Sequence, residues 1–262
     1  MDHRLSRRGL FAGAGASLVA AALGGCDNTP LVTPTAAPTV RPPANTPLAV
    51  WELTGGLNGA GMRALRAPRL VVFGDGEAIA DAAYRARLDP DQLQSLAAGL
   101  TEDLRSSGAQ KKPTVTPTMR DALVTKVSVW SESGTLSFSA EGLDEAKTDH
   151  LYADVLYTAR DRLAAVYKTV SATAQPYLAT RVRVVAVPVD GDVAGVTAWP
   201  TEVALPASGD GGLRKADLDG DAARGAVRML TRDLDQRGAW PAYRIPDGTL
   251  VRASWRYLLP NE

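Results

Sequence analysis

Four turn sequences, each with β-forming residues on both sides, recur through the chain after residue 70. The expected strand–turn–strand units cover residues 70–80, 123–140, 181–192 and 243–257. Their turns contain Gly, Asp, Ser or Pro, which accept or preset the backbone angles of tight turns, and their flanks are rich in β-forming residues. The chain is therefore expected to build its sheet from antiparallel hairpins.

Three helical patterns separate these hairpins. The first begins with the sequence LDPDQL, in which Asp89 is the expected N-cap, Pro90 the first helical residue and Gln92 the partner in a capping box. Further apolar arcs predict helices over about 150–171 and 221–236. The apolar stripe of the first helix consists of Leu93, Leu96, Ala97, Leu100 and Leu104.

Alternating hairpins and helices predict an α+β fold. We expect two layers, a mostly antiparallel sheet built from hairpins with about three helices on one face. No second Pro/Gly-rich linker interrupts residues 48–262, which predicts a single globular domain there. The last expected strand alternates, with Thr249, Val251, Ala253, Trp255 and Tyr257 on one face and Arg252, Ser254 and Arg256 on the other. This alternation predicts one covered face and one face in water.

The charge balance excludes several partners. The chain carries 29 basic and 29 acidic side chains, so the domain has no extended basic surface for a phosphate backbone, and nucleic acid is not an expected partner. The sequence has no Gly-rich phosphate loop or dinucleotide fingerprint, and we expect no nucleotide cofactor.

Residues 1–25 have the layout of an export signal. A positively charged start is followed by an apolar run from Leu10 to Leu23 and by small residues. The run is too short for a stable membrane span, which needs about 20 residues. The alternative, a buried N-terminal helix, is disfavoured because each of its glycines would cost ~1 kcal/mol relative to Ala.

Cys26, the only cysteine, follows directly, so an intramolecular disulfide is impossible. The sequence Leu23-Gly24-Gly25-Cys26 resembles the lipobox of bacterial lipoproteins. In that family the thiol receives a diacylglyceryl group and the cysteine becomes the mature N-terminus. Two or more acyl chains, such as palmitate, give durable anchoring. The resemblance implies a protein that is lipid-anchored at the cell membrane, on its extracytoplasmic face, with Cys26 as the attachment point and not a catalyst.

The start of the signal contains an arginine pair. Ser6-Arg7-Arg8-Gly9-Leu10-Phe11 resembles the twin-arginine export motif, with its usual Phe–Leu order inverted. This resemblance implies that the domain folds before it crosses the membrane. The alternative is that Arg7 and Arg8 only form the positive start of a general secretory signal.

Residues 26–47 are expected to form a tether. Between residues 27 and 47 there are six prolines and five threonines, a composition that cannot form a core and favours an extended chain. At about 3.1 Å per residue, the tether would hold the domain up to roughly 65 Å from the membrane.

Most common catalytic and metal-binding patterns are missing from the sequence. After removal of the signal, His150 is the only histidine, so zinc and thiolate catalysis are excluded, and no Gly-x-Ser-x-Gly elbow supports a Ser-His-Asp triad. The acidic run 217–221 fails the EF-hand pattern at Ala222 and Arg228, and an acidic helix start explains it better. We therefore assign no catalytic, cofactor-binding or metal-binding residue.

Two features leave alternatives open. Asp75 and Glu77 could be the carboxylate pair of a glycosidase, although a hairpin turn explains them better. Tryptophans gathered on the surface could bind sugars or an apolar ligand, although core packing is favoured. The five tryptophans are Trp51, Trp130, Trp199, Trp240 and Trp255.

The domain itself resembles a group of actinobacterial exported proteins and lipoproteins of unknown function. The resemblance rests on Phe73-Gly74-Asp75-Gly76, Trp199-Pro200 and the closing residues 256–262, and it implies a location but no mechanism. We expect a non-catalytic binding or envelope-support module, with an envelope protein or a glycan as partner. The alternative is a carboxylate-dependent hydrolase of cell-wall polymers, which requires a cleft with two carboxylates about 5–10 Å apart and an exposed tryptophan.

Overall fold

The computed structural model describes residues 41–43, 45–111, 113, 121–234, 238 and 240–262. The residues predicted for export and lipidation, Arg7, Arg8, Leu23, Gly24, Gly25 and Cys26, lie outside the described residues, as does most of the tether. Val40–Glu262 form one compact unit. Among the described residues, no helix has both the length and the apolar composition that a bilayer span requires.

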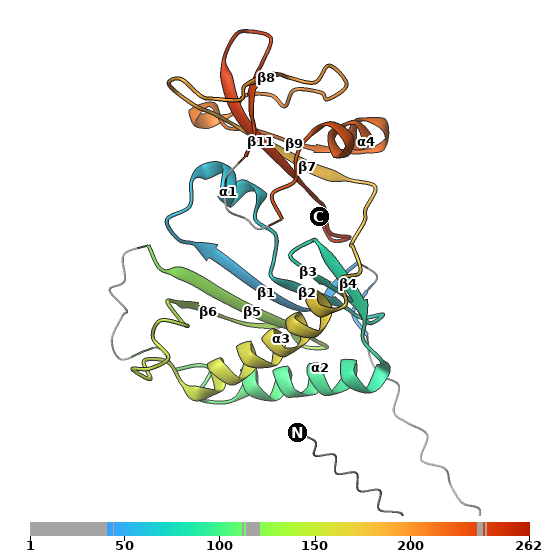
Figure 1. Ribbon diagram of the computed structural model, residues 1–262. Coiled ribbons are helices and arrows are strands. Elements are labelled where there is room, and N and C mark those ends of the chain that lie inside the picture. The colour runs from blue at the N-terminus through green and yellow to red at the C-terminus, as the bar shows by residue number, and fades with distance from the viewer. Residues whose placement is uncertain (1–40, 44, 112, 114–120, 235–237, 239) are drawn as a thin grey trace, which may run out of the picture. The chain divides into compact units, whose positions relative to one another are not determined.

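The predicted α+β class is confirmed, and the strands are divided between two mostly antiparallel sheets (Figure 1). The first sheet has the strand order β4-β3-β2-β1-β5-β6, with every neighbouring pair antiparallel. Its strands are β1 (Pro47–Gly55), β2 (Leu70–Phe73), β3 (Glu77–Ala80), β4 (Tyr84–Arg87), β5 (Leu123–Ser131) and β6 (Gly134–Glu141). The hairpins β2–β3 and β5–β6 are those predicted from the sequence.

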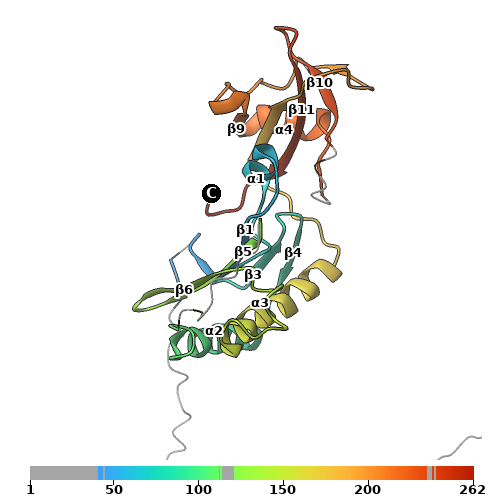
Figure 2. The same ribbon diagram turned by 90° about the vertical axis from the view of Figure 1, so that its left-hand side faces the viewer.

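Helices α2 (Pro90–Arg105) and α3 (Asp154–Ala172) cover one face of this sheet (Figures 1 and 2). α2 begins as predicted, because the Asp89 carboxylate accepts a hydrogen bond from the Gln92 backbone N–H at 2.8 Å and the Gln92 side chain accepts one from the Asp89 N–H at 3.1 Å. α3 begins at Asp154, later than predicted, because His150 has a left-handed backbone with φ of 48°.

The second sheet has the strand order β8-β10-β11-β7-β9. Its strands are β7 (Val182–Pro188), β8 (Thr197–Ala198), β9 (Arg214–Leu218), β10 (Ala242–Arg244) and β11 (Leu250–Tyr257). The predicted hairpin β10–β11 is confirmed, but the one at 181–192 is wrong. The chain leaves the sheet after Pro188, and Gly195, with φ of 72°, interrupts the stretch that would have formed the return strand. β7 therefore pairs with β9 and β11, and β8 lies parallel to β10.

Two further helices accompany the second sheet: α1 (Ala60–Leu65) and α4 (Gly220–Met229), with a single 3-10 turn at Asp210–Gly212. α4 ends short of the predicted residue 236. Leu230 adopts an extended backbone, with ψ of 146°, and its carbonyl accepts a hydrogen bond from Trp255 Nε1 at 2.9 Å. Leu234, which falls within the predicted helix, is 50% exposed.

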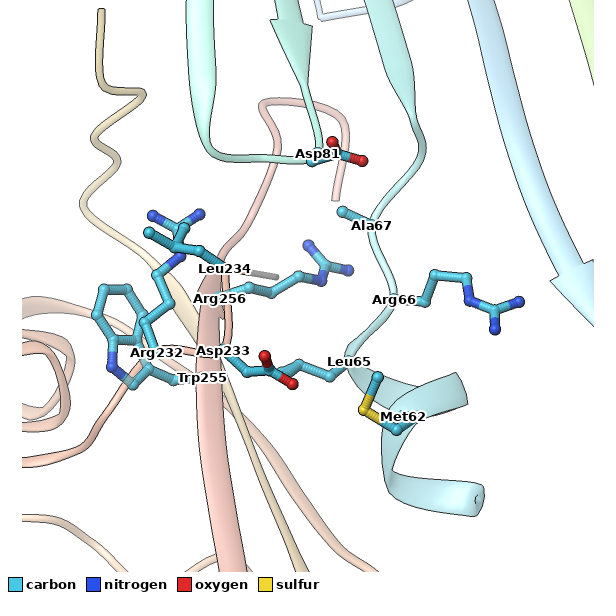
Figure 3. Close-up of a pocket in the computed structure, with 10 residues that line it drawn as sticks. All are labelled: Met62, Leu65, Arg66, Ala67, Asp81, Arg232, Asp233, Leu234, Trp255 and Arg256. Carbon is cyan, nitrogen blue, oxygen red and sulfur yellow. The ribbon is translucent and has the colours of Figure 1, made fainter. Parts of the chain in front are cut away.

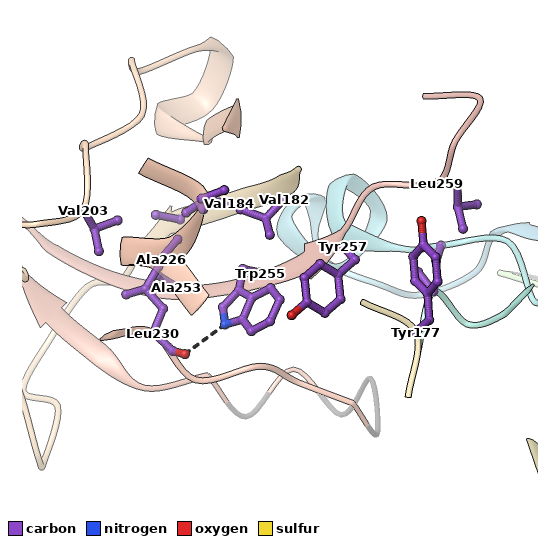
Figure 4. Packing of buried hydrophobic residues seen from close by; sticks show 14 of the residues in the cluster. Tyr177, Val182, Val184, Val203, Ala226, Leu230, Ala253, Trp255, Tyr257 and Leu259 are labelled. Carbon is purple, nitrogen blue, oxygen red and sulfur yellow. Dashed lines mark hydrogen bonds between the residues drawn. The ribbon is translucent and has the colours of Figure 1, made fainter. Parts of the chain in front are cut away.

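One hydrophobic cluster contains residues from both sheets, and Figure 4 shows the part of it on β7, β11 and α4. It joins the far face of the first sheet to β7, β11 and α4. Its members include Val71, Phe73, Ile79, Val182, Val184, Ala226, Val251, Ala253, Trp255 and Tyr257. Apolar residues of β2, β3, β7 and β11 share this cluster, so both sheets contribute to one hydrophobic core cluster.

The prediction that the polar face of β11 is in water is wrong for its second half. Ser254 is fully buried and Arg256 is 5% exposed. The Ser254 hydroxyl accepts a hydrogen bond from the Asp233 N–H and donates one to the Thr231 carbonyl, both at 3.0 Å. The segment after α4 therefore covers this face, and a buried arginine must find a charged partner.

Candidate functional site

A strongly charged cavity has a volume of about 320 Å³ and is lined by β1, α1, β7, β11 and the segment after β11. We call it the arginine pocket, defined by its charged residues Arg63, Arg66, Arg183, Arg256, Glu52 and Glu262. Four arginines face two glutamates, so the pocket lining carries a positive excess.

Two of these arginines are paired through Glu262. Arg256 Nη1 and Nη2 each donate a hydrogen bond to a Glu262 carboxylate oxygen at 2.6 Å, and the Leu259 N–H donates to Glu262 at 3.0 Å. Burial by itself would raise the pKa of the Glu262 carboxyl, but the hydrogen bonds and charge of Arg256 outweigh it and hold that pKa below its usual range. Glu262 is therefore ionised, and its carboxylate holds the Arg256 side chain in position.

Arg183 is paired with a second carboxylate. Its Nε and Nη2 donate to the two Asp217 carboxylate oxygens at 2.7 and 2.8 Å, and its Nη1 lies 3.5 Å from Glu262. Hydrogen bonding from Arg183 lowers the pKa of Asp217, and the same bonds raise the pKa of Arg183. Arg183 and Arg256 are thus both already paired with carboxylates.

Arg63 and Arg66 differ from these paired arginines. Arg63 Nη1 donates to the Asn58 carbonyl at 2.6 Å, and Arg66 Nη1 donates to the Leu53 and Gly55 carbonyls at 3.2 and 3.0 Å. Within the described ranges, neither forms an ion pair with a carboxylate. Burial and the positive charge of Arg63 lower the pKa of Arg66. This pair is therefore the unneutralised charge of the pocket.

A second cavity beside β11 is too small for a ligand. Figure 3 shows Arg256 reaching across it towards Ala67, while Arg66 points away towards β1. Its volume of about 20 Å³ holds roughly one water molecule. Its carboxylates have structural partners: Asp81 accepts from Tyr167 Oη at 2.7 Å and from Arg69 at 2.9 Å, and Asp233 accepts from Trp240 Nε1 at 2.8 Å.

Asp75 and Glu77 line another cavity, of about 310 Å³. The turn interpretation is confirmed, because the Gly76 N–H donates to the Phe73 carbonyl and Asp75 accepts from the Glu77 N–H, both at 3.0 Å. The two carboxylates are 59% and 30% exposed and lie 3.2 and 3.8 Å from arginines, so both face water and a cation and not the apolar pocket in which a glycosidase acid lies. No tryptophan is among the described residues lining this cavity.

The tryptophans are packing residues, as favoured from the sequence. Trp51, Trp199, Trp240 and Trp255 are each at most 7% exposed and belong to three different hydrophobic clusters, and Trp130 is half-buried. His150 is exposed, with Nδ1 3.4 Å from Asp154. In the described ranges, no three His, Cys, Asp or Glu residues lie close enough together to hold a metal ion.

Sequence reasoning did not find the arginine pocket. Its cations come from three elements that meet only after folding, and Arg256 was expected in water. The one local signal was that Arg63 and Arg66 are three residues apart; in the structure Arg63 lies on α1 and Arg66 directly follows it.

No protein-family model, no curated protein and no solved structure matches this chain.

Proposed function

We propose that this protein is a non-catalytic binding module, lipid-anchored on the extracytoplasmic face of the cell membrane, and that its arginine pocket binds an anionic group of an envelope partner. The observation that carries the binding proposal is the Arg63–Arg66 pair. Arg63 on α1 and Arg66 directly after it have backbone partners only, in a cavity where the other arginines are matched by carboxylates.

The location is supported by the sequence before residue 48. Arg7 and Arg8 precede an apolar run, Leu23, Gly24 and Gly25 precede the single cysteine, and a Pro/Thr-rich segment follows. Such a tether would let the domain reach partners some distance from the bilayer, up to roughly 65 Å.

The pocket fits a small anion with more than one charge. Its volume lies at the lower end of the range for small-molecule sites, about 300–1,000 Å³. Guanidinium groups match the geometry of carboxylate and phosphate oxygens. Arg63 and Arg66 would hold the ligand, while Glu262 keeps Arg256 in place.

A binding role also fits the state of the acidic residues. A general acid must hold a proton near the working pH. Glu262 has a lowered pKa and accepts hydrogen bonds from Arg256 and from the Leu259 N–H, so its protonated form is disfavoured.

The test is calorimetric titration of the full chain with citrate and with tripolyphosphate. We expect saturable binding, weakened about 10-fold or more by Arg63→Gln or Arg66→Gln, since a hydrogen bond to a charged group contributes roughly 1.5–3 kcal/mol. The matched control is Arg105→Gln, which removes one exposed charge at the end of α2 and should leave the affinity unchanged.

The affinity should also fall as salt is added, because charge attraction supplies the binding. If all three variants weaken binding equally, the attraction is one of net charge and the pocket assignment is wrong. If neither probe binds the unmodified chain saturably, the binding proposal is refuted. Circular dichroism of each variant separates lost binding from lost folding.

A further inference from the structure

Edge strands expose unpaired backbone groups, and folded proteins commonly protect them. Three of the four sheet edges in the described structure are protected. β4 carries Arg85 and Arg87, and the Arg85 N–H donates to the Gln175 carbonyl at 2.9 Å. β8 has only two residues, and β9 carries charged side chains at positions 214, 215 and 217.

β6 is the exception. It is eight residues long, from Gly134 to Glu141, and its sequence GTLSFSAE has no charged residue before Glu141 and no proline. Thr135, Ser137 and Ser139 are exposed. In the part of the chain that the structure describes, β5 is its only strand partner.

The register shows which backbone groups point outward. The Gly142 N–H donates to the Leu123 carbonyl of β5 at 2.8 Å, so Gly142 and Leu123 form a hydrogen-bonded pair. Along an antiparallel ladder, hydrogen-bonded pairs alternate with pairs whose backbone groups point away from the partner strand. Residues 140, 138 and 136 therefore bond to β5, whereas Thr135, Ser137 and Ser139 direct their N–H and C=O groups away from it. Tyr152 Oη donates to the Glu141 carbonyl at 2.6 Å and closes the far end of this edge.

We propose that β6 pairs antiparallel with β6 of a second copy of this chain, with the two-fold axis at Ser137. The outward residues Thr135, Ser137 and Ser139 can pair with the same three residues of a second copy about a two-fold axis. Ser137 pairs with Ser137 of the second copy, and Thr135 pairs with its Ser139 and the reverse. Each outward N–H and C=O then has a partner, which gives six backbone hydrogen bonds.

Side chains support a second copy over an unrelated strand. The paired stretch is uncharged, and this register places Glu141 beyond it, so no like charges face each other. On the other face, Leu136 and Phe138 are half-buried against the core under α2 and α3. In the dimer each Leu136 lies opposite Phe138 of the second copy, which extends that apolar layer. A two-fold pair of identical patches is also the commonest oligomer geometry.

Ser137→Pro tests the pairing without disturbing β5. The Ser137 N–H points outward, so proline there removes an intermolecular donor and leaves the β5 hydrogen bonds intact. In sedimentation experiments on the full chain, we expect a dimer whose dissociation constant rises more than about 10-fold in Ser137→Pro. Ser137→Ala, which keeps the N–H, should dimerise normally.

Cysteine cross-linking tests the register. In the proposed dimer the two Ser137 Cα atoms lie about 5.5 Å apart, within disulfide range, so Ser137→Cys should form a covalent dimer on mild oxidation. Ser128→Cys, opposite Ser137 on β5, is the control, because its Cα atoms would be roughly 15 Å apart. Both variants retain Cys26, so any background from that thiol is shared.

Three outcomes would overturn the proposal. The first is an unmodified chain that stays monomeric at about 100 μM, a hundredfold above a micromolar dissociation constant. The others are a dimer that survives Ser137→Pro, or equal cross-linking at positions 128 and 137. A monomer that instead binds an added extended peptide along β6 would also refute pairing between copies.

Discussion

Glu262→Gln is expected to lower the free energy of unfolding by about 3 kcal/mol, the lower end of the cost of breaking a buried ion pair. The substitution keeps the size of the side chain but removes the charge that faces Arg256. The Arg256 side chain is only 6% exposed, so its charge would remain buried without a counter-ion. Urea unfolding at pH 7 measures the loss.

Glu52→Gln is the matched control, because Glu52 lines the same pocket and faces Lys126 across the β1–β5 pair. This exchange should cost less than about 1 kcal/mol. Equal losses for the two variants would show that Arg256 does not depend on Glu262.

The same carboxylate predicts a pH dependence. Because folding lowers the pKa of Glu262, the ion pair stabilises the protein fully above the unfolded pKa, about 4.3, and this stability is lost as the pH falls through the folded pKa. Glu262→Gln should therefore reduce the acid sensitivity of unfolding below about pH 4. An unchanged pH profile would contradict the role assigned to Glu262.

Trp255→Ala is expected to cost about 3–5 kcal/mol, the usual range for removing a buried tryptophan. Trp255 packs edge-on against Tyr257 with ring centres 5.0 Å apart, and its Nε1 donates to the Leu230 carbonyl at 2.9 Å (Figure 4). The guanidinium of Arg232 lies 5.3 Å from its ring centre. The alanine variant loses these contacts and leaves the Leu230 carbonyl buried without its partner.

Trp130→Ala provides the comparison, since Trp130 is half-buried on β5. This substitution should lower the free energy of unfolding by less than about 1 kcal/mol. Far-UV circular dichroism is the appropriate probe, because both variants alter tryptophan fluorescence. A Trp255→Ala variant with unchanged stability would refute the packing role.

The sequence predicted the local elements whose signals lie within a few residues. The Asp89–Gln92 capping box, the β2–β3 turn at Gly76 and the β10–β11 turn each depend on neighbouring side chains, so one segment contains the whole signal. β1, between residues 47 and 55, was not predicted, because its place between β2 and β5 depends on pairing with distant strands.

The errors have a common physical origin. Alternation along β11 correctly placed Val251, Ala253, Trp255 and Tyr257 in the core, whereas Thr249 precedes the strand and is exposed. It could not show that the segment after α4 covers Ser254, or that Glu262 returns to Arg256. Such contacts depend on where later segments of the chain lie. The arginine pocket is of this kind, which is why no local motif indicated it.

The proposed function depends first on where the protein resides, because an envelope partner requires a domain outside the cytoplasm. The most direct measurement is the mass of the N-terminal peptide of the protein isolated from the membranes of its own host. We expect a peptide that begins at Cys26 and carries a diacylglyceryl group on its sulfur. A peptide that still begins at Met1, or a Cys26 with a free thiol, would contradict the account.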